Sequence, residues 1–112
     1  MHTKILTVAL VGIAAFLLVH DDRPAGERAK VGDEIVSQNL WTIFPENSPL
    51  LQGLPQEIVR SYGVWKVLAE NGQNLECELV GYVDPATNEF HHVLKLVPLR
   101  APINRLVVRK IR

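Results

Sequence analysis

The chain has 112 residues, 47% of them hydrophobic, and its 12 Lys+Arg residues balance its 12 Asp+Glu residues. A chain of this length forms one domain, which excludes a two-domain enzyme and a (β/α)₈ barrel of ~250 residues. The apolar fraction excludes a wholly disordered chain, and the single Cys excludes a disulfide scaffold and a Cys-rich zinc module.

The first residues form an apolar segment with polar ends. Lys4 precedes an uncharged run of 15 residues, Ile5 to Val19, and four polar residues, His20 to Arg23, follow it. This layout is typical of a secretory signal or a signal-anchor. We therefore predict a signal-anchor or transmembrane helix over residues 1–20, in contact with membrane lipid through residues 5–19.

Two observations disagree on whether this segment is cleaved. As a helix the run would extend about 22 Å at ~1.5 Å per residue, which is shorter than a hydrocarbon core of ~30 Å and favours a cleaved signal. A signal peptidase, however, prefers small residues at the first and third positions before the cut, and Leu17 to Asp22 offers none. We expect an uncleaved single-pass helix. The alternative is a cleaved, secreted β domain that binds a small ligand or a surface polymer.

Charge around the run predicts its orientation. Lys4 lies before it, whereas Asp21 and Asp22 follow it, so the positive-inside tendency places the rest of the chain outside. We therefore expect a protein of the inner (cytoplasmic) membrane whose C-terminal domain lies in the periplasm or exterior. Residues 21–34 carry eight charged side chains and are predicted to form a solvated, charged tether.

The first half of the domain contains one ambiguous segment and one helix. Ile35 to Phe44 fits a short helix capped by Asp33 nearly as well as a strand that ends at Leu40–Phe44. Several Pro and Gly residues then indicate a loop. Pro55 can begin a short helix over residues 56–62, which Gly63 would end in the left-handed conformation.

The second half predicts strands. Residues 64–69 and 75–83 flank Asn71-Gly72, a strong hairpin signal when both turn residues take a positive φ. A turn over residues 84–88, a strand over 90–97, a bend between Pro98 and Pro102 and a strand over 103–111 complete an antiparallel meander. The predicted fold is mainly β with an N-terminal membrane helix: a small antiparallel meander or barrel-like domain over residues 35–112, plus one short helix.

Charge is distributed unevenly along this domain. Residues 21–89 hold all 12 acids and five bases, a net charge of −7, whereas residues 90–112 hold six bases and no acid, a net charge of +6. The basic C-terminal strand could meet an acidic partner. Alternatively, Arg105 and Arg109 form ordinary cross-strand pairs with Glu76 and Glu78. Nucleic acid is not an expected partner, because the basic strand lacks interleaved aromatic residues and the domain is exported.

Residues capable of chemistry are few. His91 and His92 are neighbours that would point to opposite faces of a strand, so we predict no metal site and no cofactor. Cys77 lies between apolar strand residues, which favours an inert thiol over a nucleophile with His92 as its base. No nucleotide-binding or nucleophile motif occurs in the chain, so we predict that it is not an enzyme.

These features together predict a small single-pass envelope protein. It would act as a non-catalytic accessory or assembly subunit of a membrane complex, through protein–protein interaction of its outward-facing β domain. Exposed Trp residues and basic side chains are typical of such interfaces. The candidate partner-binding residues are Trp41, Trp65, Arg105, Arg109, Lys110 and Arg112.

Overall fold

The computed structural model describes residues 22–94 and 97–112. The strands in these ranges are β1 (Glu34–Asn39), β2 (Tyr62–Asn71), β3 (Asn74–Val83), β4 (Phe90–His92), β5 (Arg100–Asn104) and β6 (Val108–Ile111). The helices are single turns, α2 (Ala25–Arg28), α3 (Leu40–Ile43), α4 (Pro49–Gln52), α5 (Gln56–Val59) and the 3₁₀ turn η1 (Arg105–Val107). The predicted mainly β, antiparallel domain is confirmed.

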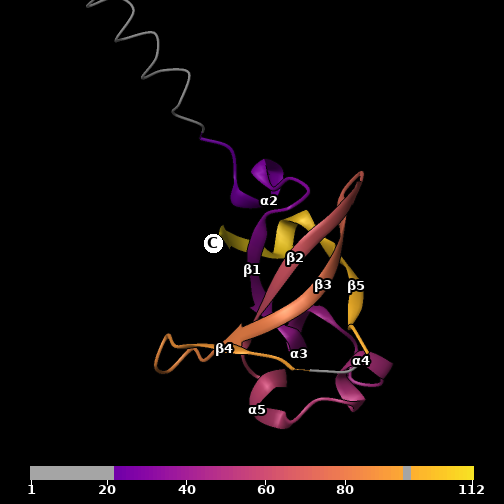
Figure 1. The fold of residues 1–112 in the computed structure, drawn as a ribbon, viewed down its shortest axis with the longest axis vertical. Helices are drawn as coiled ribbons and strands as arrows, with labels where there is room; N and C mark the ends of the chain where they lie inside the picture. The colour runs from indigo at the N-terminus through magenta and orange to yellow at the C-terminus, as the bar shows by residue number, and fades with distance from the viewer. Residues whose placement is uncertain (1–21, 95–96) are drawn as a thin grey trace, which may run out of the picture.

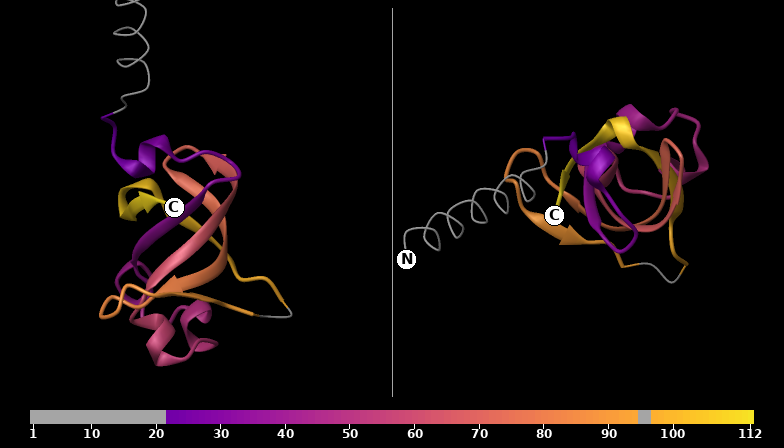
Figure 2. Two further views of the ribbon diagram at one scale, coloured as in Figure 1. Left: turned by 60° about the vertical axis from the view of Figure 1, so that its left-hand side comes forward. Right: turned by 90° about the horizontal axis from the view of Figure 1, so that it is seen from above.

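The strands form one curved antiparallel sheet in the order β4-β3-β2-β1-β6. β5 pairs with the first half of β3, whereas β4 pairs with its end. The sheet bends into a ring that is visible from above (Figure 2, right), and η1 joins its outer strands β5 and β6. The chain is therefore a meander up to β4, after which β6 returns to pair with β1.

The core fills this ring. Trp65 is fully buried, and its indole Nε1 donates a hydrogen bond of 3.0 Å to Oγ of the buried Ser37. This bond satisfies the polar indole N–H inside an otherwise apolar interior. On β3, Leu75, Cys77 and Leu79 are buried at alternate positions, as the sequence pattern predicts.

Short helices lie at both ends of the ring. α2 lies at the upper end in Figure 1, and α3, α4 and α5 lie toward the lower end. In the ambiguous segment that begins at Ile35, the strand alternative is correct up to Asn39, where β1 ends, and the helix capped by Asp33 does not form. Residues 40–43, where the strand is predicted to end, form the helical turn α3, which Asn39 precedes. The predicted membrane helix over residues 1–20 lies outside the described residues. Within 22–94 and 97–112, no helix has the length and apolar character needed to cross a bilayer.

The predicted hairpin turn and the predicted end of the helix before β2 both differ from the structure. The hairpin turn is centred on Gly72-Gln73, because Asn71 still pairs with Asn74, and φ is positive at Gly72 (+60°) but not at Asn71. One positive φ at the first turn position is what a type II′ turn requires. The helix before β2 ends at Val59, and Gly63 lies inside β2, where the indole of Trp65 leaves no room for a side chain.

The last two predicted strands have different bounds in the structure. The strand predicted over residues 90–97 is β4, which ends at His92, and Leu94 is 93% exposed. The strand predicted over 103–111 begins earlier, at Arg100 inside the predicted bend, and η1 divides it into β5 and β6. Asn104 produces this division, because its side-chain oxygen accepts a hydrogen bond of 2.9 Å from the Leu106 amide and so caps the 3₁₀ turn.

Candidate functional site

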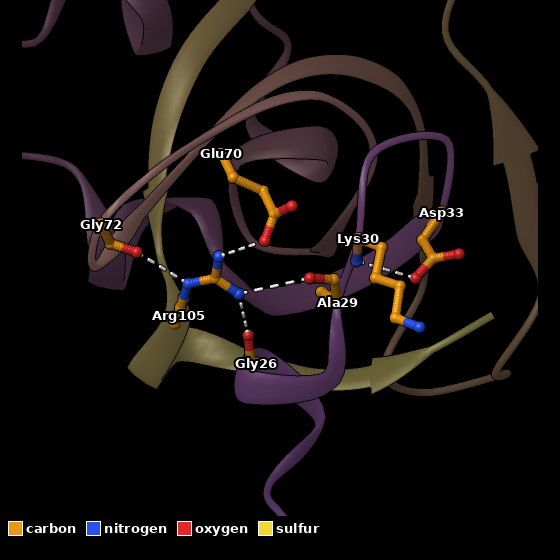
Figure 3. Close-up of polar contacts among 7 residues, drawn as sticks. All are labelled: Gly26, Ala29, Lys30, Asp33, Glu70, Gly72 and Arg105. Atoms are coloured by element: carbon orange, nitrogen blue, oxygen red, sulfur yellow. Dashed lines mark hydrogen bonds and ion pairs between the residues drawn. The ribbon is translucent and has the colours of Figure 1, made fainter.

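Arg105 lies in η1 and connects three separate segments of the chain (Figure 3). Its Nε donates to the carbonyl of Gly72 in the hairpin turn at 2.8 Å, and one terminal nitrogen donates to the carbonyls of Gly26 and Ala29 at 2.9 and 3.3 Å. The other terminal nitrogen forms an ion pair of 2.7 Å with Glu70. We call these five residues the Arg105 cluster. Each of the three guanidinium nitrogens has at least one acceptor, so Arg105 holds these segments of the fold together.

The Arg105 cluster attaches the segment that the sequence predicts to be a solvated tether. Gly26 and Ala29 are buried, and α2 packs against η1 and β6. A Cβ atom at Gly26 would lie 1.7 Å from the carbonyl oxygen of Arg105, so only glycine permits this approach. The prediction of a free tether over residues 21–34 is therefore wrong from Ala25 onward. Small residues allow close packing here where large apolar ones are absent.

A β-bulge places two cations side by side on β6. In the ladder with β1, Val36 pairs with Lys110 while Ser37 pairs with Val108, so Arg109 is an extra residue. On a regular strand Arg109 and Lys110 would point to opposite faces. The bulge lets both remain exposed on the outside, while Val108 still packs in the core.

These cations lie over a small apolar cluster on the outer face of the sheet. Val36, Val64 and Val83 form this cluster, and Tyr62 and Phe90 pack against it. The guanidinium of Arg109 lies 4.0 Å from the centre of the Tyr62 ring, and that of Arg112 lies 3.8 Å from the centre of the Phe90 ring. We call this surface the basic face; its members are Tyr62, Phe90, Arg109, Lys110 and Arg112.

The cations of the basic face differ in their partners. Arg112 also forms an ion pair of 2.7 Å with Glu34, whereas within 22–94 and 97–112 neither Arg109 nor Lys110 has a hydrogen-bonded or ion-paired side chain. A hollow of about 340 Å³ lies beside these two cations and is lined by Val36, Tyr62, Val83, Pro85, Asn88, Arg109 and Lys110. A guanidinium stacked on a ring keeps its in-plane N–H donors available for a carboxylate.

The predicted cross-strand pairs with Glu76 and Glu78 do not form. Glu76 lies opposite Pro102 and Glu78 lies opposite Arg100, whereas Arg105 pairs with Glu70. Sequence reasoning missed Glu70 as a partner because η1 interrupts the strand and changes the register. It also missed Tyr62 and Phe90 as platforms for the cations, since a bulge has no clear sequence signal.

The two candidate tryptophans lie in different environments. Trp41 is 61% exposed on α3 and lines a hollow of about 430 Å³ together with Leu51, Leu54 and Val59. Trp65, in contrast, is fully buried in the core, so in this fold it is not available to contact a partner. Of the six predicted partner-binding residues, the structure gathers only Arg109, Lys110 and Arg112 on one surface.

The residues considered for chemistry are dispersed. His91 and His92 are both exposed; His91 stacks on Tyr82, and His92 lies edge-on to Phe90. No group of three or more His, Cys, Asp or Glu side chains that could hold a metal ion occurs in the described part of the chain. Burial raises the pKa of the Cys77 thiol to about 12, with a smaller contribution from Glu76, so the reactive thiolate is scarce at neutral pH.

The described residues thus provide two features: the Arg105 cluster, which attaches α2, and the basic face, on which the Arg109 and Lys110 cations are available. Comparison with protein-family models, with curated proteins and with solved structures finds no match to this chain.

Proposed function

We propose that the protein is a single-pass envelope protein and a non-catalytic accessory or assembly subunit of a membrane complex. Residues 5–19 hold it in the bilayer, and the outward-facing β domain binds a partner protein. The basic face receives an acidic segment of that partner. Trp41 and its hollow, at a different part of the surface, are not required for this contact.

One observation carries the proposal. The bulge at Arg109 turns two neighbouring cations outward, and neither has a partner side chain among the residues that the structure describes. Bulges are often found where a side chain is re-aimed for function. Tyr62 and Phe90 add rigid apolar area beside the cations, and aromatic residues with Arg are the side chains enriched in protein interfaces.

Charge complementarity favours an acidic partner. Residues 90–112 carry six bases and no acid, and Glu34, which contacts the basic face, is already paired with Arg112. Exposed charges mainly speed association and select the partner, and salt screens them over about 8 Å at physiological ionic strength. Binding through the basic face should therefore weaken as salt rises.

Site-specific photocrosslinking tests the contact. A photoreactive phenylalanine analogue replaces Asn88, at the edge of the hollow beside Arg109 and Lys110, in the full chain in native membranes. A separate sample of the same chain carries the analogue at Gln52 on α4 instead. We expect a defined adduct from position 88 only. The variant Arg109→Gln/Lys110→Gln, probed from the same position 88, should lose the adduct at least tenfold. The control Arg60→Gln/Arg100→Gln removes the same charge elsewhere and should retain it.

Four results would contradict parts of this proposal. An equal adduct from Gln52, or an equal loss in the control variant, would show that the basic face is not the docking surface. A large drop in melting temperature for Arg109→Gln/Lys110→Gln would assign these cations to the fold instead. An intact mass lacking residues 1–25 in protein from native membranes would remove the membrane segment and support the secreted alternative.

A further inference from the structure

We infer that the α2 end of the domain lies directly against the bilayer surface, with Val31 and Leu106 in contact with lipid headgroups and the first acyl carbons. This inference rests on the proposed membrane segment. It goes further, because it names a second interaction surface and fixes which end of the domain faces the lipid.

Two exposed apolar side chains lie beside α2. Val31, in the turn that follows α2, is 57% exposed, and Leu106, on η1, is 82% exposed. The Arg105 cluster holds both segments together, since the Arg105 side chain on η1 bonds to the carbonyl of Ala29, two residues before Val31. The turn itself is fixed on β2 by a hydrogen bond of 2.9 Å from the Gly32 amide to the Val67 carbonyl. Both apolar side chains therefore project from rigid backbone.

The length of the connection restricts where this end can be. Residues 20–24 separate the apolar run from the first residue of α2, Ala25. Six steps of extended chain cover at most about 22 Å, and the headgroup region alone occupies roughly 5–7 Å on each side of a bilayer. Since α2 is attached to the rest of the domain through the Arg105 cluster, the end of the domain that carries α2 cannot move far from the lipid.

Charged side chains of both signs surround the two apolar residues. Lys30 is exposed next to Val31, whereas Asp22 and Glu27 are exposed acids at the same end. Apolar side chains that project between charged groups enter the acyl boundary while the charged groups stay among the hydrated headgroups. The helices α3, α4 and α5 lie at the end opposite α2 (Figure 1), so that end is then directed away from the bilayer.

Depth-dependent quenching tests this orientation. Single cysteines replace Val31, Leu106 and, as a control at the far end, Gln52 in the full chain, which is placed in nanodiscs of phosphatidylethanolamine and phosphatidylglycerol (3:1). Each carries an environment-sensitive nitrobenzoxadiazole label. The native Cys77 is buried and should not react with the label. Labelling of the unsubstituted protein checks this. We expect blue-shifted emission at positions 31 and 106, and at least threefold stronger quenching by brominated lipid there than at position 52.

The outcomes separate this inference from the proposed function. If the chain is not retained in the nanodiscs at all, the membrane segment of the proposed function is wrong. If the chain is retained but brominated lipid quenches the three labels equally, the membrane segment is supported and the inferred orientation is wrong. The same conclusion follows if the labels at positions 31 and 106 are quenched only by iodide added to the aqueous phase. Emission that is blue-shifted but unquenched by brominated lipid would indicate a protein surface over α2, which also overturns the inference.

Discussion

Replacing Arg105 with alanine should destabilise the domain much more than the loss of one ion pair. The side chain is only 13% exposed and donates to three carbonyls as well as to Glu70. Hydrogen bonds of charged groups contribute about 1.5–3 kcal/mol each, but they are not additive where water can rehydrate the acceptors. We expect a loss of about 3 kcal/mol, which corresponds to roughly 12–24 °C in melting temperature for a domain of this size.

Two variants isolate the cause of this loss. Glu70→Gln removes only the ion pair, whose carboxylate side chain is 47% exposed, so it should cost no more than about 1 kcal/mol. Arg105→Lys keeps the positive charge, but one ammonium group cannot donate hydrogen bonds to the Gly72 carbonyl and to the α2 carbonyls at the same time. Its melting temperature should therefore lie between those of Arg105→Ala and the unsubstituted protein.

The assay combines thermal unfolding with amide hydrogen exchange on the full chain in mild detergent. In Arg105→Ala, exchange should rise at least tenfold for residues 29–33, whose amides include Gly32 bonded to Val67 and Asp33 bonded to Lys30. Amides in the middle of β2 and β3 should respond less. The reasoning is refuted if Glu70→Gln destabilises the domain as much as Arg105→Ala does, or if exchange over residues 29–33 does not change.

Three further predictions follow from single residues. Gly26→Ala should cost about 3 kcal/mol in denaturant unfolding despite the better helix propensity of alanine, because its Cβ would overlap the Arg105 carbonyl oxygen; an unchanged midpoint would contradict this packing. The Cys77 pKa rises from 9.0 to about 12 on folding, so its contribution to stability is complete below pH 9 and is lost as pH rises toward 12; Cys77→Ala should lack this part of the alkaline loss of stability. Trp41→Phe should leave only the blue-shifted emission of the buried Trp65, resistant to iodide, whereas Trp65→Phe should leave a quenchable spectrum.

Much of the β domain could be predicted because its signals are local. The alternation of Leu75, Cys77 and Leu79 with glutamates fixes one buried face, and a Gly in the reversal fixes a hairpin to within one residue. The turn over residues 84–88 also forms as predicted, with the Ala86 amide bonded to the Asp84 carboxylate and a positive φ at Asn88. Each of these features depends only on residues a few positions apart.

The parts that could not be predicted depend on distant contacts. Arg105 reads as a member of a basic strand, yet its partners Gly26 and Ala29 lie 79 and 76 residues away in the sequence. Gly26 and Ala29 have little apolar surface, so their burial gives no hydropathy signal. Likewise the pairing of Arg109 with the Tyr62 ring depends on the bulge between β1 and β6, which only the register of the folded sheet reveals.

The short chain between the apolar run and α2, together with the attachment of α2 to the domain, is inferred to orient the domain on the bilayer. Lengthening that short chain tests this inference. Six Gly and Ser residues inserted between His20 and Asp21 add a flexible span of about 13 Å without touching any contact within the described residues. The melting temperature of the domain should therefore stay within about 2 °C. Lipid quenching at positions 31 and 106 should fall by at least half, because the short connection no longer holds this end at the bilayer. If quenching stays unchanged while the inserted chain is retained in the nanodiscs, the surface itself holds the domain, and the role given to the short connection is wrong.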